Sequence, residues 1–261
     1  MGIQGAAAAT VFGQIVAMFL ALILNHSKNK EVRINFRSFT PNWRTISIIY
    51  QVGVPSIIMQ SISSVMTFGM NKILIGFSET AVAVFGVYFK LQSFIFMPIF
   101  GLNNGMIPIV AYNYGARSKK RIMETVWLSI GIAVGIMLIG LMVFHLMTPQ
   151  LLMLFQADEE MLAIGVPALR IISLSFLFAG YCIIVGSVFQ ALGNGVYSLI
   201  ISVARQLVCI LPLAWFFART FGLHAVWLSL PLAEITSVVL SSILFRKIYL
   251  DKIKPLGQAA A

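Results

Sequence analysis

Residues 101–121 have the sequence GLNNGMIPIVAYNYGARSKKR, which closes a long apolar stretch with a dense group of cations. The preceding stretch, 81–100, holds a single charged side chain, Lys90. A helix needs about 20 predominantly apolar residues to cross a bilayer. An apolar stretch that ends in a basic cluster predicts a membrane-spanning helix whose basic end faces the cytoplasm. The cluster consists of Arg117, Lys119, Lys120 and Arg121.

The composition extends this interpretation to all 261 residues of the chain. Hydrophobic residues make up 59% and charged residues 10%, and the mean hydropathy is +0.95. Soluble domains carry about 25% charged residues, so the lipid bilayer must be the main partner of this chain. The net charge of +10 comes from short clusters between apolar runs. That pattern is typical of membrane proteins, and we exclude a nucleic-acid partner.

Apolar runs recur along the whole chain, and their lengths match membrane spans. Proline, glycine and clustered charges separate the runs from one another. The sequence therefore predicts an all-α polytopic membrane protein with about seven transmembrane helices. The predicted ranges are 3–24, 46–76, 81–111, 125–147, 161–192, 196–218 and 223–246.

The charged residues between these helices predict the orientation of the chain. Cations cluster after the first and third helices and after the seventh. The opposite connections hold one cation, Arg219, beside the carboxylates of Glu79 and 158–160. The positive-inside rule places the basic connections and the C-terminus in the cytoplasm. We therefore expect a multi-pass protein of the cell membrane, whether inner or plasma membrane.

In this orientation the first helix runs from the outside inwards, which normally requires an earlier helix that runs outwards. We therefore expect the chain to be the C-terminal part of a longer protein whose N-terminal lobe is missing. Four segments follow from this expectation. They are 1–25, the last helix of the missing lobe; 26–45, a basic cytoplasmic linker between lobes; 46–248, a six-helix C-terminal lobe; and 249–261, a cytoplasmic tail.

Polar side chains recur at helical spacing on one face of the second predicted helix. An unpaired polar group in hydrocarbon costs several kcal/mol, so such a face predicts either a cavity or bonds to neighbouring groups. Serine and threonine also bond to carbonyls of their own helix, and that alternative stays open for them. The candidate cavity-lining residues on this face are Gln60, Ser63, Ser64, Thr67 and Asn71.

Four further candidates for the cavity lie on the other helices: Lys90, Asn104, Gln190 and Arg205. Lys90 either snorkels to the nearby interface or pairs inside the bundle. Glu234 is the only carboxylate deep in a predicted span. Such a residue indicates an ion or substrate pathway by default, which makes Glu234 a weak candidate for ion coupling. The alternatives for Glu234 are an ion pair with Arg205 or a place nearer the interface.

The sequence offers no constellation for catalysis or metal binding. Cys182 and Cys209 lie in apolar runs without metal-type spacing, and the three histidines are isolated. An enzyme needs a nucleophile, an acid–base pair or a metal set within mutual reach. We therefore expect no metal, no cofactor and no enzymatic activity.

Several motifs resemble those of MATE transporters, the multidrug and toxic compound extrusion family. AVAVFGV at 81–87, GLNNGMIPIV at 101–110 and YNYGA at 112–116 are the recognisable pieces of a stretch that resembles the seventh and eighth helices of that family. The stretch from Phe189 to Trp215 resembles the junction of the tenth and eleventh helices. GLHAVWLSLPLAE at 222–234 resembles the twelfth helix. The resemblance covers nearly the whole chain and is strongest to the bacterial multidrug-export branch.

The resemblance implies a 12-helix fold of two six-helix lobes around a central cavity. This chain would supply helix 6 and the C-terminal lobe. It implies multidrug efflux, in which cationic or amphipathic drugs leave as Na⁺ or H⁺ enters, and a single lobe is expected to be inactive alone. Some members carry cation-site carboxylates in the seventh and tenth helices. Here the seventh-helix face is Gln60, Ser63, Ser64 and Thr67.

A lipid-linked saccharide flippase of the same superfamily is the alternative function. Such flippases often line their cavity with cations, and Lys90 and Arg205 give this alternative some support.

Overall fold

The computed structural model describes residues 2–29 and 40–257. The chain divides into two compact units, 1–49 and 50–261. The first unit contains α1 (Gly2–Lys28), a continuous apolar helix, and the beginning of α2 (Trp43–Leu74). The central part of the predicted linker and the last four residues of the predicted tail lie outside the described residues.

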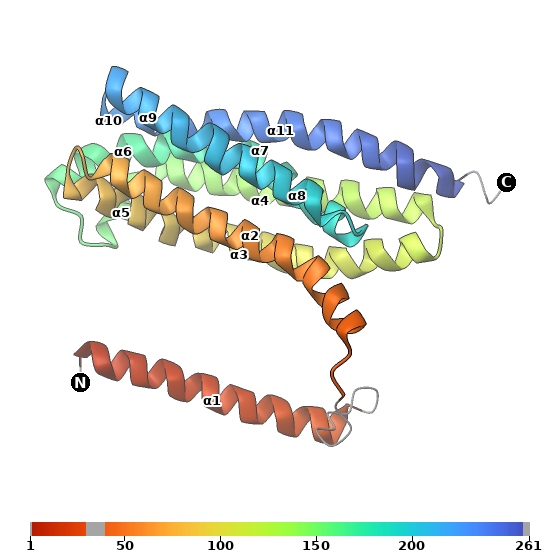
Figure 1. Cartoon of the computed structure of the whole chain (residues 1–261). Coiled ribbons are helices and arrows are strands. Elements are labelled where there is room, and N and C mark those ends of the chain that lie inside the picture. Colours follow the sequence, from red (N-terminus) through yellow and green to blue (C-terminus); the bar gives the residue numbers. More distant parts are fainter. Residues whose placement is uncertain (1, 30–39, 258–261) are drawn as a thin grey trace. The chain divides into compact units, whose positions relative to one another are not determined.

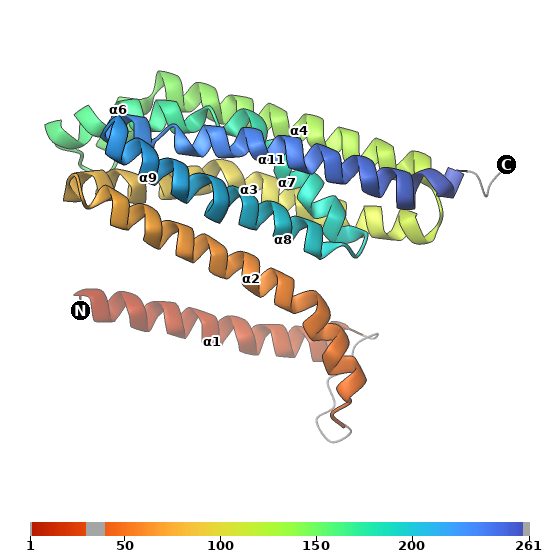
Figure 2. The same ribbon diagram turned by 45° about the horizontal axis from the view of Figure 1, so that its top comes forward.

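Helices of the second unit run side by side along one common direction, as two views of the ribbon show (Figures 1 and 2). Its first three long helices are the remainder of α2, then α3 (Glu79–Gly115) and α4 (Lys119–Leu146). The short α5 (Thr148–Met153) leads to α6 (Glu159–Ser173) and α7 (Phe176–Ala191). The C-terminal part consists of α8 (Gly195–Val203), η2 (Ala204–Ile210), α9 (Leu211–Thr220), α10 (Leu223–Val226), α11 (Ser229–Ile248), η3 (Tyr249–Ile253) and η4 (Lys254–Gly257).

Each of the seven predicted ranges is helical, which confirms the all-α fold class. Among the described residues, five helical stretches are long and apolar enough to cross a membrane. The pair α6 and α7 makes a sixth if it is counted as one span. The helix α2 is not in this count, so a seventh span stays a prediction.

The predicted helix 161–192 is broken, and its two halves meet at an angle of 49°. At the break, Leu174 and Ser175 donate their backbone N–H groups to carbonyls three residues back, at 3.2 and 2.9 Å. Bonds of this kind tighten the helix into a 3₁₀-type turn. The break follows from this local change of hydrogen bonding.

The predicted helix 196–218 changes its winding in the middle. Residues Ala204–Ile210 form the π-helical segment η2, between α8 and α9. Pro212 lies in the first turn of α9, and a proline inside a helix cannot donate the bond to the carbonyl four residues back. The helix is widened in the turns directly before this proline, and π-type turns of this kind are frequent at functional sites.

The core of the second unit lies around α4, which packs against both α3 and α7. Small residues permit this close packing. A Cβ atom placed on Gly180 of α7 would meet the backbone of Ala133 in α4 at 3.2 Å. Two aromatic side chains, Phe144 and Phe176, meet edge to face beside this contact, with ring centroids 5.1 Å apart. This core holds α3, α4 and α7 as the scaffold on which the polar residues are carried.

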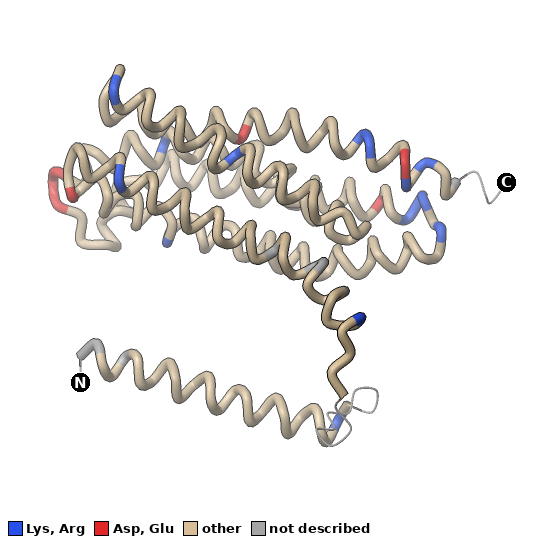
Figure 3. The backbone as a smooth tube through the Cα atoms, in the orientation of Figure 1, with Lys and Arg blue, Asp and Glu red and all other residues tan. Residues whose placement is uncertain are grey.

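The structure places the basic and acidic connections at opposite ends of the bundle, with the larger group of Lys and Arg residues at one end (Figure 3). At the basic end, Lys119 Nζ lies 5.4 Å from the ring centroid of Tyr249, and Lys252 Nζ donates to the Leu192 carbonyl at 2.8 Å. At the other end, Glu79 and Asp158 line the same surface pocket. The α3–α4 connection, the α7–α8 turn and the C-terminal segment therefore share one end, as the charge pattern predicts.

Candidate functional site

Two neighbouring cavities lie within the second unit, between its helices. The first, which we name the polar cavity, has a volume of about 380 Å³ and lies between α3, α7, α8 and η2. The second, which we name the aromatic cavity, has a volume of about 450 Å³ and is lined from α2, α3, α7, η2 and α11. Phe100, Ile183 and Arg205 line both, so the two cavities share a wall.

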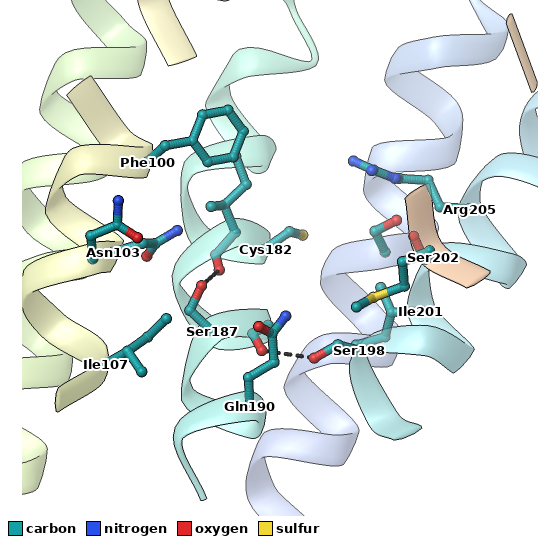
Figure 4. Close-up of a pocket in the computed structure, with 15 residues that line it drawn as sticks. Phe100, Asn103, Ile107, Cys182, Ser187, Gln190, Ser198, Ile201, Ser202 and Arg205 are labelled. Atoms are coloured by element: carbon teal, nitrogen blue, oxygen red, sulfur yellow. Dashed lines mark hydrogen bonds between the residues drawn. The ribbon is translucent and has the colours of Figure 1, made fainter. Parts of the chain in front are cut away.

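Amide and hydroxyl side chains lie beside apolar ones on the wall of the polar cavity, as the close-up shows (Figure 4). Ser198 Oγ donates to the Gly186 carbonyl at 2.7 Å and so ties α8 to α7. Gln206 Nε2 donates to Ser202 Oγ at 2.9 Å within the same span. The side-chain oxygen of Asn103 is buried without a hydrogen-bond partner among the described residues. The main polar residues of this cavity are Asn103, Asn104, Ser187, Gln190, Ser202 and Arg205.

The aromatic cavity combines rings and methionines with one carboxylate. Its apolar wall includes Tyr88, Phe89, Phe96, Phe100, Met66 and Met97. Glu234 enters it from α11 and is 8% exposed. A concave, largely apolar surface with few convergent polar groups is the usual form of a small-molecule site.

An ion pair lies between the two cavities. Arg205 Nη1 donates to Glu234 Oε1 at 2.6 Å, which joins η2 to α11. The Arg205 side chain is 29% exposed and the Glu234 side chain 10%. Burying a charge without a partner costs several kcal/mol, and the pairing therefore explains how both charges are tolerated inside the bundle. Of the alternatives for Glu234, the structure contains the ion pair with Arg205.

Some of the predicted site residues line the two cavities, and others lie outside them. Arg205 lines both cavities; Asn104 and Gln190 line the polar cavity; Ser63, Thr67 and Glu234 line the aromatic cavity. The remaining candidates are not among the lining residues of these two cavities. They are Gln60 and Ser64, which are exposed, Asn71, which is half-buried, and Lys90, whose Nζ lies 5.8 Å from the ring centroid of Phe155.

Hydroxyl groups that line the cavities also form hydrogen bonds within their own helices. Thr67 Oγ1 donates to the Ser63 carbonyl at 2.9 Å, and Ser187 Oγ to the Ile183 carbonyl at 3.0 Å. These bonds are the local arrangement that serine and threonine commonly adopt. The hydroxyls of these residues therefore offer acceptor oxygens to a cavity rather than hydrogen-bond donors.

Sequence reasoning missed Asn103 as a cavity residue and did not select Ser202. Lys90 and Asn104 share one face of the third predicted helix by their helical spacing, which favoured Asn104, although Asn103 is the more buried of the two asparagines. For Ser202 a signal was present, because Ser198, Ser202 and Arg205 follow one another at helical spacing. Within the described residues, no three His, Cys, Asp or Glu side chains gather as a metal site.

The fold and the site together define a multi-pass α-helical membrane protein with one polar and one aromatic cavity between its helices. A family model described as MatE matches residues 55–216. The chain belongs to this MATE family of membrane transporters.

Similar proteins agree with this assignment. The multidrug export protein MepA of Staphylococcus haemolyticus strain JCSC1435 is 26% identical over 234 residues, which are 90% of this chain and 51% of MepA. MepA of Staphylococcus aureus strain RF122 is also 26% identical over 237 residues, with the same coverage. The chain therefore spans about half the length of the curated relatives that it matches.

Solved structures share the fold over nearly the whole chain. A transporter of Pyrococcus furiosus, described as a MOP superfamily member with reverse polarity of its binding pocket, is 27% identical with a TM-score of 0.86, over 98% of this chain and 57% of that one. A multidrug resistance MATE transporter in an outward-facing conformation is 26% identical, also with a TM-score of 0.86, over 99% of this chain and 58% of that one.

Proposed function

We propose that the chain forms one lobe of a multidrug exporter that removes cationic or amphipathic compounds in exchange for Na⁺ or H⁺. The observation that carries this proposal is the match to the MATE family over residues 55–216, together with the similarity to MepA proteins described as multidrug exporters. The two adjoining cavities, one polar and one aromatic, supply surfaces suited to amphipathic molecules.

The proposal includes a second lobe. Alternating access works by the movement of one repeat against another around a shared site, and the 51% coverage of MepA supports the view that this chain supplies only one of them. By itself it is proposed to be inactive. The basic end shared by the α3–α4 connection and the C-terminal segment is proposed to be cytoplasmic.

The test is dye efflux from bacteria that lack their own exporters. One strain expresses the chain alone, and another expresses it fused behind the N-terminal half of a MepA relative. We expect ethidium efflux only from the fusion. Export by the chain alone would contradict the requirement for two lobes, and loss of export in a fusion that reaches the membrane would contradict the assignment.

Variants of the fusion test the cavity residues. Asn104→Leu removes a polar group from the polar cavity, and Thr236→Leu makes a comparable change at an exposed position that lines neither cavity. We expect efflux to fall at least fivefold in the first and to stay within twofold of the unmodified fusion in the second. Equal efflux in both variants would show that the polar cavity does not take part in export.

Glu234 is proposed as the ion-coupling residue because its second carboxylate oxygen is buried without a hydrogen-bond partner among the described residues and it lines the aromatic cavity. In the fusion, Glu234→Gln is expected to abolish the dependence of efflux on a Na⁺ or H⁺ gradient while dye still binds. Gradient-driven efflux that survives this change would place coupling elsewhere.

A lipid-linked saccharide flippase is the second candidate. The observation that favours it is a cation, Arg205, in the wall of both cavities. Binding of an undecaprenyl-linked saccharide by the fusion, without dye efflux, would favour this function.

A further inference from the structure

The charged groups are divided unequally between the two cavities. Glu234 lines the aromatic cavity, whereas Arg205 lines both. Among the described residues that line the polar cavity, Arg205 is the only charged side chain, and no carboxylate is present. The close-up shows its side chain extending from η2 toward the part of the cavity near Cys182 (Figure 4). The polar cavity therefore meets the positive partner of an ion pair whose carboxylate lines only the aromatic cavity.

The ion pair leaves part of the guanidinium unused. A fork-to-fork contact between arginine and a carboxylate makes two parallel bonds, but here only Nη1 to Oε1 is formed. Nε of Arg205 is buried without a hydrogen-bond partner among the described residues, and so is Oε2 of Glu234. A buried donor without a partner costs about 1–3 kcal/mol, more when it is charged. Because Nε itself is buried, a ligand can reach the guanidinium only through the part of the Arg205 side chain that is exposed, and that side chain is 29% exposed.

Several hydroxyl groups on the wall of the polar cavity are already used as hydrogen-bond donors. Ser187, Ser198 and Ser237 donate their hydroxyl hydrogens to the carbonyls of Ile183, Gly186 and Ala233. These three hydroxyls have no hydrogen left to give. Five lining side chains retain donor groups for a molecule in the cavity: Arg205, Asn103, Asn104, Gln190 and Ser202.

The remaining wall suits a small organic body. Phe100, Ile107 and Ile201 supply apolar surface next to these donors. The volume of about 380 Å³ falls at the lower end of the range of about 300–1,000 Å³ that small-molecule sites span. A compact ring that carries one charged group fits the volume of the cavity. It also fits a wall that is apolar in one part and carries hydrogen-bond donors in another.

We propose that the polar cavity is a binding site for an organic oxyanion, a carboxylate or a phosphate monoester, held by the Arg205 guanidinium. The oxyanion accepts hydrogen bonds from the guanidinium, and the amide side chains elsewhere on the lining are available to other polar groups of the ligand. Glu234 competes with the ligand for Arg205 from the far side of the shared wall. The ligand binds the chain itself at equilibrium, and this binding does not require transport.

Four fluorinated probes of similar size test it: 4-fluorobenzoate, 4-fluorophenyl phosphate, 4-fluorobenzyl alcohol and 4-fluorobenzylammonium. Binding to the full chain in nanodiscs of neutral lipid is measured by ¹⁹F NMR. We expect one of the two anions to bind at least tenfold more tightly than the alcohol, and the stronger anion identifies the oxyanion class. Equal affinity for anions and alcohol, or preference for the ammonium probe, overturns the proposal.

Substitutions at Arg205 and Glu234 test whether Arg205 holds the anion. Glu234→Gln removes the competitor and is expected to tighten anion binding at least threefold, whereas a cation site would lose affinity in the same variant. Arg205→Gln combined with Glu234→Gln removes both charges together, which avoids leaving one unpaired, and should weaken anion binding more than tenfold. Arg170→Gln, the matched control at an exposed position outside both cavities, should change it less than twofold.

Two results would contradict the assignment to Arg205: undiminished anion binding in a folded double variant, or weaker binding after Glu234→Gln. Gel filtration and circular dichroism check the fold of each variant. If the double variant does not fold, the affinities of the unmodified chain for the anion, alcohol and ammonium probes still test whether the cavity prefers an oxyanion.

Discussion

Arg205 and Glu234, 29 positions apart in the chain, meet through one nitrogen and one oxygen at 2.6 Å. The contact joins the π-helical segment η2 to α11 and separates a polar cavity from an aromatic one. Because the pair is made on one side only, each partner keeps a buried polar atom free. The pair therefore links two helices and leaves one buried polar atom of each partner without a hydrogen bond among the described residues.

The first prediction concerns the contribution of this ion pair to stability. Arg205→Met leaves the Glu234 carboxylate buried without a partner, and breaking such a pair costs about 3–5 kcal/mol. The double variant Arg205→Met with Glu234→Met removes both charges and should recover more than half of this loss. Detergent-induced unfolding of the four proteins in a double-mutant cycle measures the coupling. Additive effects of the two single changes would show that the pair is not coupled.

The second prediction concerns the close approach of α4 and α7. Gly180→Val places side-chain atoms against the backbone of Ala133, which already lies 3.2 Å from the position of a Cβ atom. Overpacking of this kind costs about 1–3 kcal/mol. Gly131→Val is the control, because no atom lies within 4 Å of a Cβ atom at that position. If both variants lose the same unfolding free energy, the loss is caused by helix propensity alone and not by overpacking against α4.

The third prediction concerns the hydrogen bond between Ser198 and the Gly186 carbonyl. Ser198→Ala removes a contact between α8 and α7, and such interhelical bonds contribute about 0.6–1.7 kcal/mol. Ser93→Ala removes a hydroxyl that bonds only within its own helix, to the Phe89 carbonyl at 2.8 Å, and should cost less than about 0.5 kcal/mol. The difference in unfolding free energy between the two variants is the measurement, and its absence would refute a special role for Ser198.

The fourth prediction concerns orientation. Single cysteines at position 118, in the basic connection between α3 and α4, and at position 157, between α5 and α6, are introduced after both native cysteines are changed to serine. A membrane-impermeant maleimide added to intact cells should label Ala157→Cys and leave Ser118→Cys unlabelled until the cells are opened. The reverse pattern would invert the proposed topology.

Much of the architecture could be predicted from the sequence. Helical ranges, membrane class and the sharing of one end by the basic connections follow from hydropathy and charge, which are local properties. Motifs such as GLNNGMIPIV also carried the family resemblance, and the match over residues 55–216 confirmed it. For these features each residue acts largely through its own transfer free energy or charge, so the order of residues along the chain is sufficient.

The tertiary structure decided which polar groups meet. Each residue turns a helix by about 100°, so a wide turn such as η2 shifts the facing of every side chain after it, and the 49° bend between α6 and α7 redirects another span. Regular helical spacing could not reveal that Asn103 lines the polar cavity or that Gln60 stays outside both cavities. Glu234 and Arg205 were both visible as buried charges in the sequence. Their one-sided contact depends on the packing of separate helices, which no local pattern specifies.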